Sequence, residues 1–354
     1  MKKHLCFWVV MLVLSGIVHQ PIYAVSQDAD PVRLYLSGVK MLGEEKHGNL
    51  TIVPVVSSAR DSGADVKTLD EALKSGSLSV TEASESGNVN RLHVVNKSKS
   101  FVFIMAGEIL AGAKQDRILQ SDVLIPPESG KVTVEAFCVE HGRWQYSSKG
   151  FYSMGQSANI GTRGAARQYR DQSQVWQKVA ETNKAMAATA PTGSLAKSFD
   201  SPKYAAQKDE YKAKFKEITS RYPEMTGAIV LIKGKVLAAD LFSNHRIFQN
   251  LWEKLLDSYI MEAISAEGIE VKSDFTSAVS FMEAARKATV KYVKTPGAGF
   301  NIDLASATIT GSGVIKGDIP MHLDIFPIIE GDAGSKMRQD FQRNYRQRRG
   351  GNAP

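Results

Sequence analysis

Reactive side chains are densest at positions 107–117, where the sequence reads GEILAGAKQDR. The segment follows an apolar stretch and places carboxylates, an amide and two cations beside two glycines, which let a backbone bend sharply or approach a ligand. Such a group could bind and polarise an oxygen-rich substrate. The alternative is a surface turn with solvated charges. The candidates are Glu108 for catalysis and Lys114, Gln115 and Arg117 for ligand binding.

A second group, CVEHGRW at 138–144, ends another apolar stretch. Glu140 is its candidate catalytic carboxylate. Arg143 and Trp144 are its candidate ligand-binding residues, because an arginine can hold phosphate or carboxylate and a tryptophan can stack on a ring. His141 could serve as a general base with a glutamate nearby. These roles require the two segments to converge on one pocket.

Cys138 and Arg143 have the spacing of the anion-binding loop in sulfurtransferases and cysteine-based phosphatases. In those loops backbone N–H groups and an arginine hold an anion beside a reactive thiolate. Such loops run directly into a helix, whereas residues 145–150 are polar and show no helical pattern. The sequence therefore favours Cys138 as a small buried hydrophobe.

Other motifs are weak. No Walker loop, G-x-G-x-x-G or G-x-S-x-G occurs, and the histidines form no HxH or HxxxH pair. Neither a metal site nor a cofactor is therefore predicted. The stretch RGAARQYR at 163–170 could clamp a phosphate, but its composition favours a flexible basic loop. The run GSG at 311–313 is predicted to be a turn.

The apolar pattern predicts an α+β fold with mixed, mainly antiparallel sheets and several packed helices in one large domain at 25–335. A break between two lobes could fall within 146–202. Strands are expected at 32–42, 50–56, 78–80, 89–95, 101–105, 123–125, 132–139, 228–232, 236–242, 290–293, 308–309, 314–315 and 321–329. Helices are expected at 69–73, 171–188, 204–222, 248–264 and 276–288.

Local signals specify several connections between these elements. Thr68 with Glu71 three residues later predicts a capping box at a helix start. The polar run 96–100 and the tripeptide Lys-Gly-Lys at 233–235 each predict a hairpin. Residues 146–169 are rich in Ser, Gly, Gln and Arg, which predicts a long surface loop.

Residues 1–24 read as a cleavable signal peptide: two lysines, an apolar run at 5–18 and a small residue before the expected cut. The apolar run is shorter than the ~20 residues that span a bilayer, and no second run of that length follows, so no transmembrane anchor is expected. The chain should be exported to the periplasm or beyond. Cleavage would leave Cys138 as the sole cysteine, without an internal disulfide.

The net charge of +7 is concentrated at the two ends of the chain. The signal peptide carries two lysines, and residues 336–354 carry six basic residues against Asp340. The body between them is therefore charge-balanced. A basic tail of this kind is typically disordered. It could contact an anionic envelope surface, whereas export argues against nucleic acid as a partner.

The sequence resembles the ARG and rhodanese-phosphatase-superfamily-associated protein domain family, a domain of unknown function, from Val32 to about Glu330. The stretches that carry the resemblance are GEILAGAKQDRIL, LIPPESGKVTVEAFCVEHGRW, QVWQKV, GAIVLIKGKVLAADLF and LWEKLLDSYIMEA. The resemblance implies a link to ADP-ribose or related nucleotides, mainly in the cytoplasm. This chain departs from that setting because it carries a predicted signal peptide. The family's characteristic polar residues fall on Glu108, Lys114, Gln115, Arg117, Glu140, Arg143 and Trp144.

Two functions follow from these observations. The first is a ligand-binding module or hydrolase-like domain for a small molecule that carries a phosphate or carboxylate, related to a nucleotide or ADP-ribose. The second is a non-catalytic structural or interaction protein of the envelope that uses the basic tail as its contact. In the second case Glu108, Arg117 and Glu140 would form a buried polar network that orders the sheet.

Overall fold

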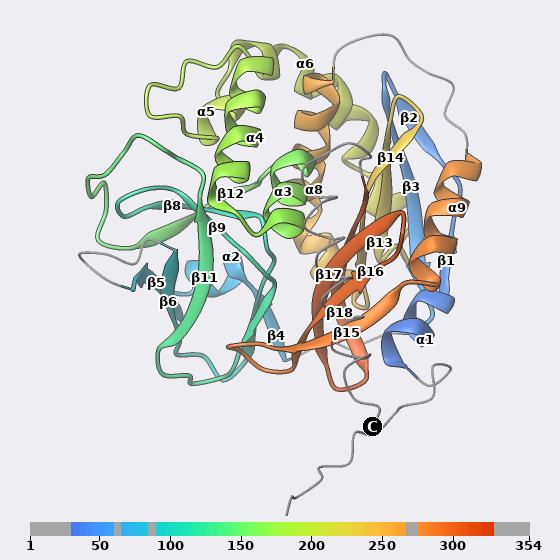
Figure 1. Ribbon diagram of the computed structural model, residues 1–354, viewed down its shortest axis with the longest axis horizontal. Helices are drawn as coiled ribbons and strands as arrows, with labels where there is room; N and C mark the ends of the chain where they lie inside the picture. Colours follow the sequence, from blue (N-terminus) through green and yellow to red (C-terminus); the bar gives the residue numbers. More distant parts are fainter. Residues whose placement is uncertain (1–29, 60–64, 84–89, 267–274, 329–354) are drawn as a thin grey trace, which may run out of the picture.

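Three sheets organise the part of the chain that the structure describes, which is residues 30–328 apart from 60–64, 84–89 and 267–274. The structure is a computed structural model (Figure 1). Among the described strands only β4 and β7 pair in parallel, and the rest pair antiparallel. The α+β class with mainly antiparallel sheets is confirmed. The predicted signal peptide and basic tail lie outside the described residues.

The largest sheet has nine strands in the order β1-β3-β13-β14-β18-β17-β16-β15, with β2 added beside β3. Its hairpin β13–β14 turns at Lys233 and Gly234, which both have positive φ, as the tight turn predicted there requires. The strands are β1 (Val39–Met41), β2 (Glu45–His47), β3 (Leu50–Ser57), β13 (Gly227–Ile232), β14 (Lys235–Phe242), β15 (Thr289–Lys294), β16 (Phe300–Ala305), β17 (Ile309–Lys316) and β18 (Ile319–Pro327).

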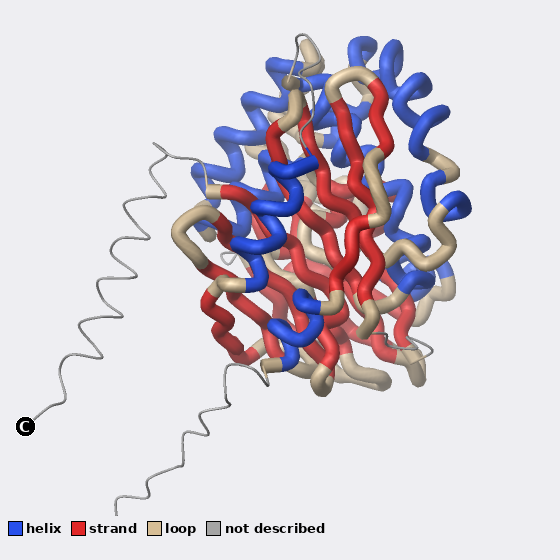
Figure 2. The backbone as a smooth tube through the Cα atoms, turned by 90° about the vertical axis from the view of Figure 1, so that its right-hand side faces the viewer, coloured by secondary structure: helices blue, strands red, loops and turns tan. Residues whose placement is uncertain are grey.

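Helices cover both faces of this sheet. On one face α1 (Pro31–Ser37) and α9 (Phe275–Arg286) pack over an apolar core; Figure 2 views this face with the helices across the strands. On the other face lies α8 (His245–Ser265), which contains the helix predicted at 248–264. Its apolar residues Leu251, Leu255, Tyr259 and Ala263, spaced by four, are all buried. None of the described helices is both long and apolar enough to cross a membrane.

A smaller β unit lies beside the large sheet (Figure 1) and has its own apolar core. Its sheets run β10-β7-β4 and β12-β8-β9-β11-β6-β5. The predicted capping box is present at the start of α2 (Leu69–Lys74). The strands are β4 (Val66–Thr68), β5 (Leu78–Glu82), β6 (Arg91–Asn96), β7 (Phe101–Ile104), β8 (Glu108–Gly112), β9 (Arg117–Leu119), β10 (Val123–Ile125), β11 (Val132–Cys138) and β12 (Phe151–Ser157).

A helical layer covers the region between the two units. It consists of α3 (Ile160–Tyr169), α4 (Gln172–Ala185), α5 (Ala196–Phe199), α6 (Pro202–Phe215) and α7 (Ile218–Arg221). In Figure 1 α4 lies above β11 of the small β unit, and α3 lies between α4 and α8. This layer therefore joins the small β unit to the large sheet.

Two predictions about the N-terminal half are wrong. Residues 32–37 are helical rather than extended, because Asp30 caps the N–H groups of Val32 and Arg33. Residues 96–100 do form a turn, with Asn96 Nδ2 donating to Ser100 O at 2.8 Å. The strands that flank this turn nevertheless belong to different sheets, so no hairpin forms.

Two further predictions are wrong because distant parts of the chain fix the local conformation. The expected loop at 146–169 contains β12, which pairs with β8, and α3. The GSG run at 311–313 lies inside β17 rather than in a turn. Its glycines allow a close approach to β18, since a Cβ on Gly313 would lie 2.0 Å from His322 O. The strands without a counterpart among the predicted strands are β2, β4, β8, β9, β12 and β16.

Candidate functional site

The two sequence-predicted segments meet in the structure. Strands β8 and β9 form a hairpin whose turn lies against the chain that follows β11. Cys138 pairs with Arg117 across the β9–β11 ladder, and Val139 N donates to Asp116 O at 2.9 Å. We call residues 112–117 together with 139–147 the hairpin cluster.

Arg143 is the central cation of the hairpin cluster. Its Nε donates to Glu140 Oε2 at 2.8 Å, and its Nη2 donates to Asp116 Oδ1 at 3.0 Å. Its Nη1 donates to Ala113 O and to Ser147 Oγ, each at 2.8 Å. Because all three nitrogens donate to protein groups, Arg143 ties the hairpin turn to the loop after β11.

The two carboxylates of this cluster are also held by other protein groups. Glu140 Oε2 accepts from Asp116 N at 3.2 Å, and Glu140 Oε1 accepts from Thr192 Oγ1 at 2.7 Å. Asp116 Oδ2 accepts from Ser194 Oγ at 3.1 Å. Burial and the neighbouring Glu140 together raise the pKa of the Asp116 carboxyl. The cluster therefore also fixes the segment at 192–194.

Arg117 and Gln115 form a second set of contacts in the hairpin cluster. The Arg117 side chain is fully buried, and its Nη1 donates to Gln115 Oε1 at 3.0 Å. Gln115 Nε2 in turn donates to His141 O at 3.1 Å. Cys138 is buried as well, which confirms the interpretation as a small buried residue, and burial raises the pKa of its thiol. A raised pKa disfavours the thiolate that reactive cysteines need.

Glu108 has its polar contacts outside the hairpin cluster. Its Oε1 lies 2.6 Å from Nζ of Lys254 on α8, and its Oε2 accepts from Met105 N at 2.8 Å. Lys254 Nζ also lies 2.7 Å from Asp70 Oδ1. Burial raises the pKa of the Glu108 carboxyl, although Lys254 acts in the opposite direction. The structure thus brings the other predicted residues together and places Glu108 against α8.

Exposed aromatic side chains gather on the surface of the hairpin cluster. Trp144 is 51% exposed and Tyr146 is 54% exposed. Lys114 Nζ lies 5.0 Å from the centroid of the Trp144 ring and 5.1 Å from that of Tyr146, which are cation–π distances. We call these three residues the aromatic platform. Tyr152, 57% exposed, follows on β12.

The model of one protein family covers nearly all of this architecture. The ARG and Rhodanese-Phosphatase-superfamily-associated Protein domain (ARPP-1) matches residues 38–326. The chain belongs to the ARPP-1 family. The match includes the large sheet, the small β unit and every residue of the hairpin cluster. Comparisons with curated proteins and with solved structures gave no match.

The ARPP-1 domain also contains a buried ion network that sequence reasoning missed. Arg163 on α3, 1% exposed in its side chain, makes two hydrogen bonds to Asp240 on β14, at 2.6 and 2.9 Å. Tyr259 on α8 donates its hydroxyl to the same carboxylate at 2.6 Å. Burial alone would raise the pKa of the Asp240 carboxyl. The charge and hydrogen bonds of Arg163 outweigh this effect and hold that pKa well below its usual range.

The same network continues through His322 on β18. His322 Nδ1 lies 2.8 Å from Asp122 Oδ2, and its Nε2 lies 3.4 Å from Asp240 Oδ1. Arg167 on α3 pairs with Asp122 at 3.1 Å and with Asp324 at 2.8 Å. Burial disfavours the charged imidazole, but the carboxylates outweigh burial and raise the pKa of His322 to about 9. With His322 protonated, three cations balance three carboxylates.

Two signals in the ARPP-1 sequence could have indicated this network. Single acidic residues occur in otherwise apolar stretches, as in VLAADLF around Asp240 and MHLDIFP around Asp324. A buried carboxylate needs a partner. Arg163 and Arg167, four residues apart, would share one face of a helix. Among the described residues, no group of three or more His, Cys, Asp or Glu side chains is placed to hold a metal ion.

Proposed function

We propose that the chain is an exported ligand-binding module whose ligand carries a planar ring and a phosphate or carboxylate, as a nucleotide or ADP-ribose does. The binding surface is the aromatic platform. The proposal rests on one observation, the placement of the Lys114 ammonium about 5 Å from two half-exposed aromatic rings. The rings offer stacking surfaces, and the ammonium attracts an anionic group beside them.

The support beneath the aromatic platform favours this function. Trp144 directly follows Arg143, whose bonds to Glu140, Asp116 and Ala113 hold the loop in place. A loop fixed in this way loses little conformational entropy when a ligand binds. The aromatic platform is therefore a preorganised surface on a rigid support.

The environment of the glutamates supports binding rather than hydrolysis. Both oxygens of Glu140 accept hydrogen bonds from protein groups, and Glu108 is paired with Lys254. Arg117 is fully buried, so in this arrangement its role is to support the surface. Lys114 is then the cation proposed to meet the ligand's anionic group.

Isothermal titration calorimetry on the mature chain tests the proposal. The ligands are AMP, ADP-ribose, adenosine, ribose 5-phosphate and an aromatic carboxylate, so that ring and anion are varied separately. AMP or ADP-ribose should bind more tightly than either adenosine or ribose 5-phosphate. Trp144→Ala should weaken binding by about 1–3 kcal/mol, the usual contribution of one stacked ring. Lys114→Gln should abolish the preference for AMP over adenosine.

Phe300→Ala is the matched control for Trp144→Ala. Phe300 is 53% exposed, close to the 51% of Trp144, but lies on β16 in the large sheet. Its replacement should leave binding unchanged. Equal effects of the two substitutions, or binding that survives Trp144→Ala, would remove the aromatic platform from the proposal. Failure of every ligand in the panel would contradict the proposed ligand class.

The proposed export has its own test. Expression of the full chain in a bacterial host, followed by fractionation and intact-mass measurement, should give a mature product that begins at Val25. A product that keeps residues 1–24 and stays in the cytoplasm would contradict export. That outcome would leave the binding experiment valid, because the aromatic platform does not involve those residues.

A further inference from the structure

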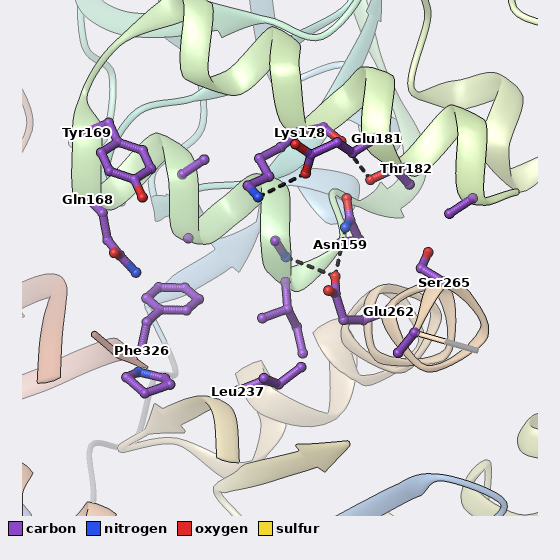
Figure 3. Close-up of a pocket in the computed structure, with 17 residues that line it drawn as sticks. Asn159, Gln168, Tyr169, Lys178, Glu181, Thr182, Leu237, Glu262, Ser265 and Phe326 are labelled. Carbon is purple, nitrogen blue, oxygen red and sulfur yellow. Dashed lines mark hydrogen bonds and ion pairs between the residues drawn. The ribbon is translucent and has the colours of Figure 1, made fainter. Parts of the chain in front are cut away.

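A cavity of about 320 Å³ lies between α3, α4, the C-terminal part of α8 and the strands β14 and β18 (Figure 3). Its volume is at the lower end of the roughly 300–1,000 Å³ typical of small-molecule sites. Phe326, Leu237 and Ile160 give it an apolar wall. None of the residues of the aromatic platform lines it, so it is a second and separate site.

Glu262 on α8 is the main polar group inside the cavity. Its Oε2 accepts from Asn159 Nδ2 at 2.7 Å and from Gly161 N at 2.9 Å, at the start of α3. No described residue hydrogen-bonds to its Oε1. The carboxylate is therefore fixed in orientation by one oxygen, while the other can accept from a ligand.

The remaining charges of the cavity balance each other. Lys178 and Glu181 on α4 form an ion pair at 2.9 Å. In Figure 3 this pair lies above Asn159 and Glu262, while Gln168, Tyr169 and Phe326 lie at the left of the view. Without a ligand, the cavity therefore carries the single net negative charge of Glu262, beside aromatic and aliphatic side chains.

The buried ion network holds the walls of this cavity together. Arg163, adjacent to the cavity-lining Gly164, links α3 to Asp240 on β14. Tyr259, one turn before Glu262, links α8 to the same carboxylate. Three of the elements that form the cavity are thus fixed by charged hydrogen bonds behind it. A site with a rigid shell of this kind is preorganised for a ligand.

We propose that this cavity binds a small molecule with a primary ammonium group and an apolar or aromatic body. The ammonium group donates to Glu262 Oε1, and the body packs against Phe326 and Leu237. An anionic ligand is disfavoured, because the carboxylate of Glu262 already accepts from Gly161 N at the start of α3 and would repel it. The inference is independent of the function proposed for the aromatic platform.

Probes of matched shape and different charge test this proposal. The mature chain is titrated with 2-phenylethylamine, 2-phenylethanol and 3-phenylpropionate, and binding is followed by two-dimensional NMR up to about 10 mM, the range expected of fragment-sized ligands. The amine should bind at least roughly tenfold more tightly than the alcohol, because its bond to the carboxylate is charge-assisted. The shifted resonances should include those of Gly161 and Gly164.

Two variants assign the effect to Glu262. Glu262→Gln keeps an oxygen that can accept from Gly161 N but removes the charge, so it should abolish the preference for the amine. Glu181→Gln changes the other carboxylate of the cavity, which is paired with Lys178, and should keep the preference. Circular dichroism and thermal unfolding show whether each variant is folded.

A third variant keeps the proposal testable if Glu262→Gln does not fold. Ala185→Leu leaves Glu262 in place and narrows the cavity from the α4 side, so it should reduce amine binding. Absence of saturable amine binding to the wild type would overturn the proposal. So would equal affinity for amine and alcohol, or binding that neither Glu262→Gln nor Ala185→Leu reduces.

Discussion

The hairpin cluster and the buried ion network are both built from arginines and carboxylates, but they differ in depth and in sequence range. Arg143 of the hairpin cluster is 20% exposed in its side chain and lies three residues from its partner Glu140. Arg163 of the network is 1% exposed and lies 77 residues from Asp240. The first arrangement fixes a surface loop, whereas the second joins two helices to the large sheet.

This difference predicts how each group responds to substitution. A deeply buried ion pair is weak evidence for net stability, but removal of one partner leaves an uncompensated buried charge. A partly exposed cation can be replaced at lower cost, because water solvates the groups left behind. The buried ion network should therefore control global unfolding, and the hairpin cluster should control the local order of the aromatic platform.

The largest effect is expected for Arg163→Met. The substitution leaves Asp240 without its main cation in the core and should lower the free energy of unfolding by about 3–5 kcal/mol. Urea denaturation measures the loss. Arg170→Met is the control: Arg170, half-exposed on the surface, pairs with Asp303 at 2.7 Å, and its loss should cost no more than about 1 kcal/mol. Similar losses of unfolding free energy in the two variants would contradict the difference expected between a buried and an exposed ion pair.

The second prediction concerns pH. Because the folded chain raises the pKa of His322 to about 9, the folded state holds this proton more tightly than the unfolded state, whose pKa is near 6.5. The resulting stabilisation is fully present below about pH 6.5 and is lost as the pH rises toward 9. Over that range it should amount to something on the order of 3 kcal/mol.

The control for this pH dependence is His322→Gln. Its free energy of unfolding at pH 6.5 should be lower than that of the wild type, and it should change less between pH 6.5 and 8.5. Urea denaturation at several pH values compares the two curves. Parallel curves would show that another group causes the pH dependence.

Sequence patterns predicted the elements that neighbouring residues determine, but not those that depend on contacts with distant residues. The capping box at Thr68, the hairpin at 233–235 and the helix at 248–264 follow from neighbouring residues, and the structure confirms them. The convergence of 107–117 with 138–144 was required for the predicted site, and the two segments do meet. By contrast, the prediction of a flexible basic loop at 163–170 is wrong: this stretch forms most of α3. Arg163 and Arg167 pair there with acidic side chains of distant strands, which the local sequence does not indicate.

The third prediction concerns Gly107, which directly precedes strand β8 and contacts Arg163 of the buried ion network. Its φ is +91°, and a Cβ there would lie 2.6 Å from Cδ of Arg163, a side chain that its bonds to Asp240 hold in place. Gly107→Ala should therefore destabilise the fold by about 2 kcal/mol more than Gly76→Ala. Gly76 also has a positive φ, but no atom lies within 4 Å of its added Cβ. Equal losses would show that backbone strain alone, rather than contact with Arg163, makes Gly107 necessary.

The smallest effect is expected for Arg143→Lys. Lysine keeps the charge near Glu140 and Asp116 but cannot reproduce the planar fork that also reaches Ala113 O. The free energy of unfolding should fall by only about 1–2 kcal/mol. Arg221→Lys, at an exposed position of α7, is the near-neutral control. Local opening should rise more clearly, seen as faster hydrogen exchange and proteolysis at 139–150. If the loop stays protected, Arg143 does not hold the aromatic platform. If the loop opens while global stability barely changes, the platform and the buried ion network are separable units of stability.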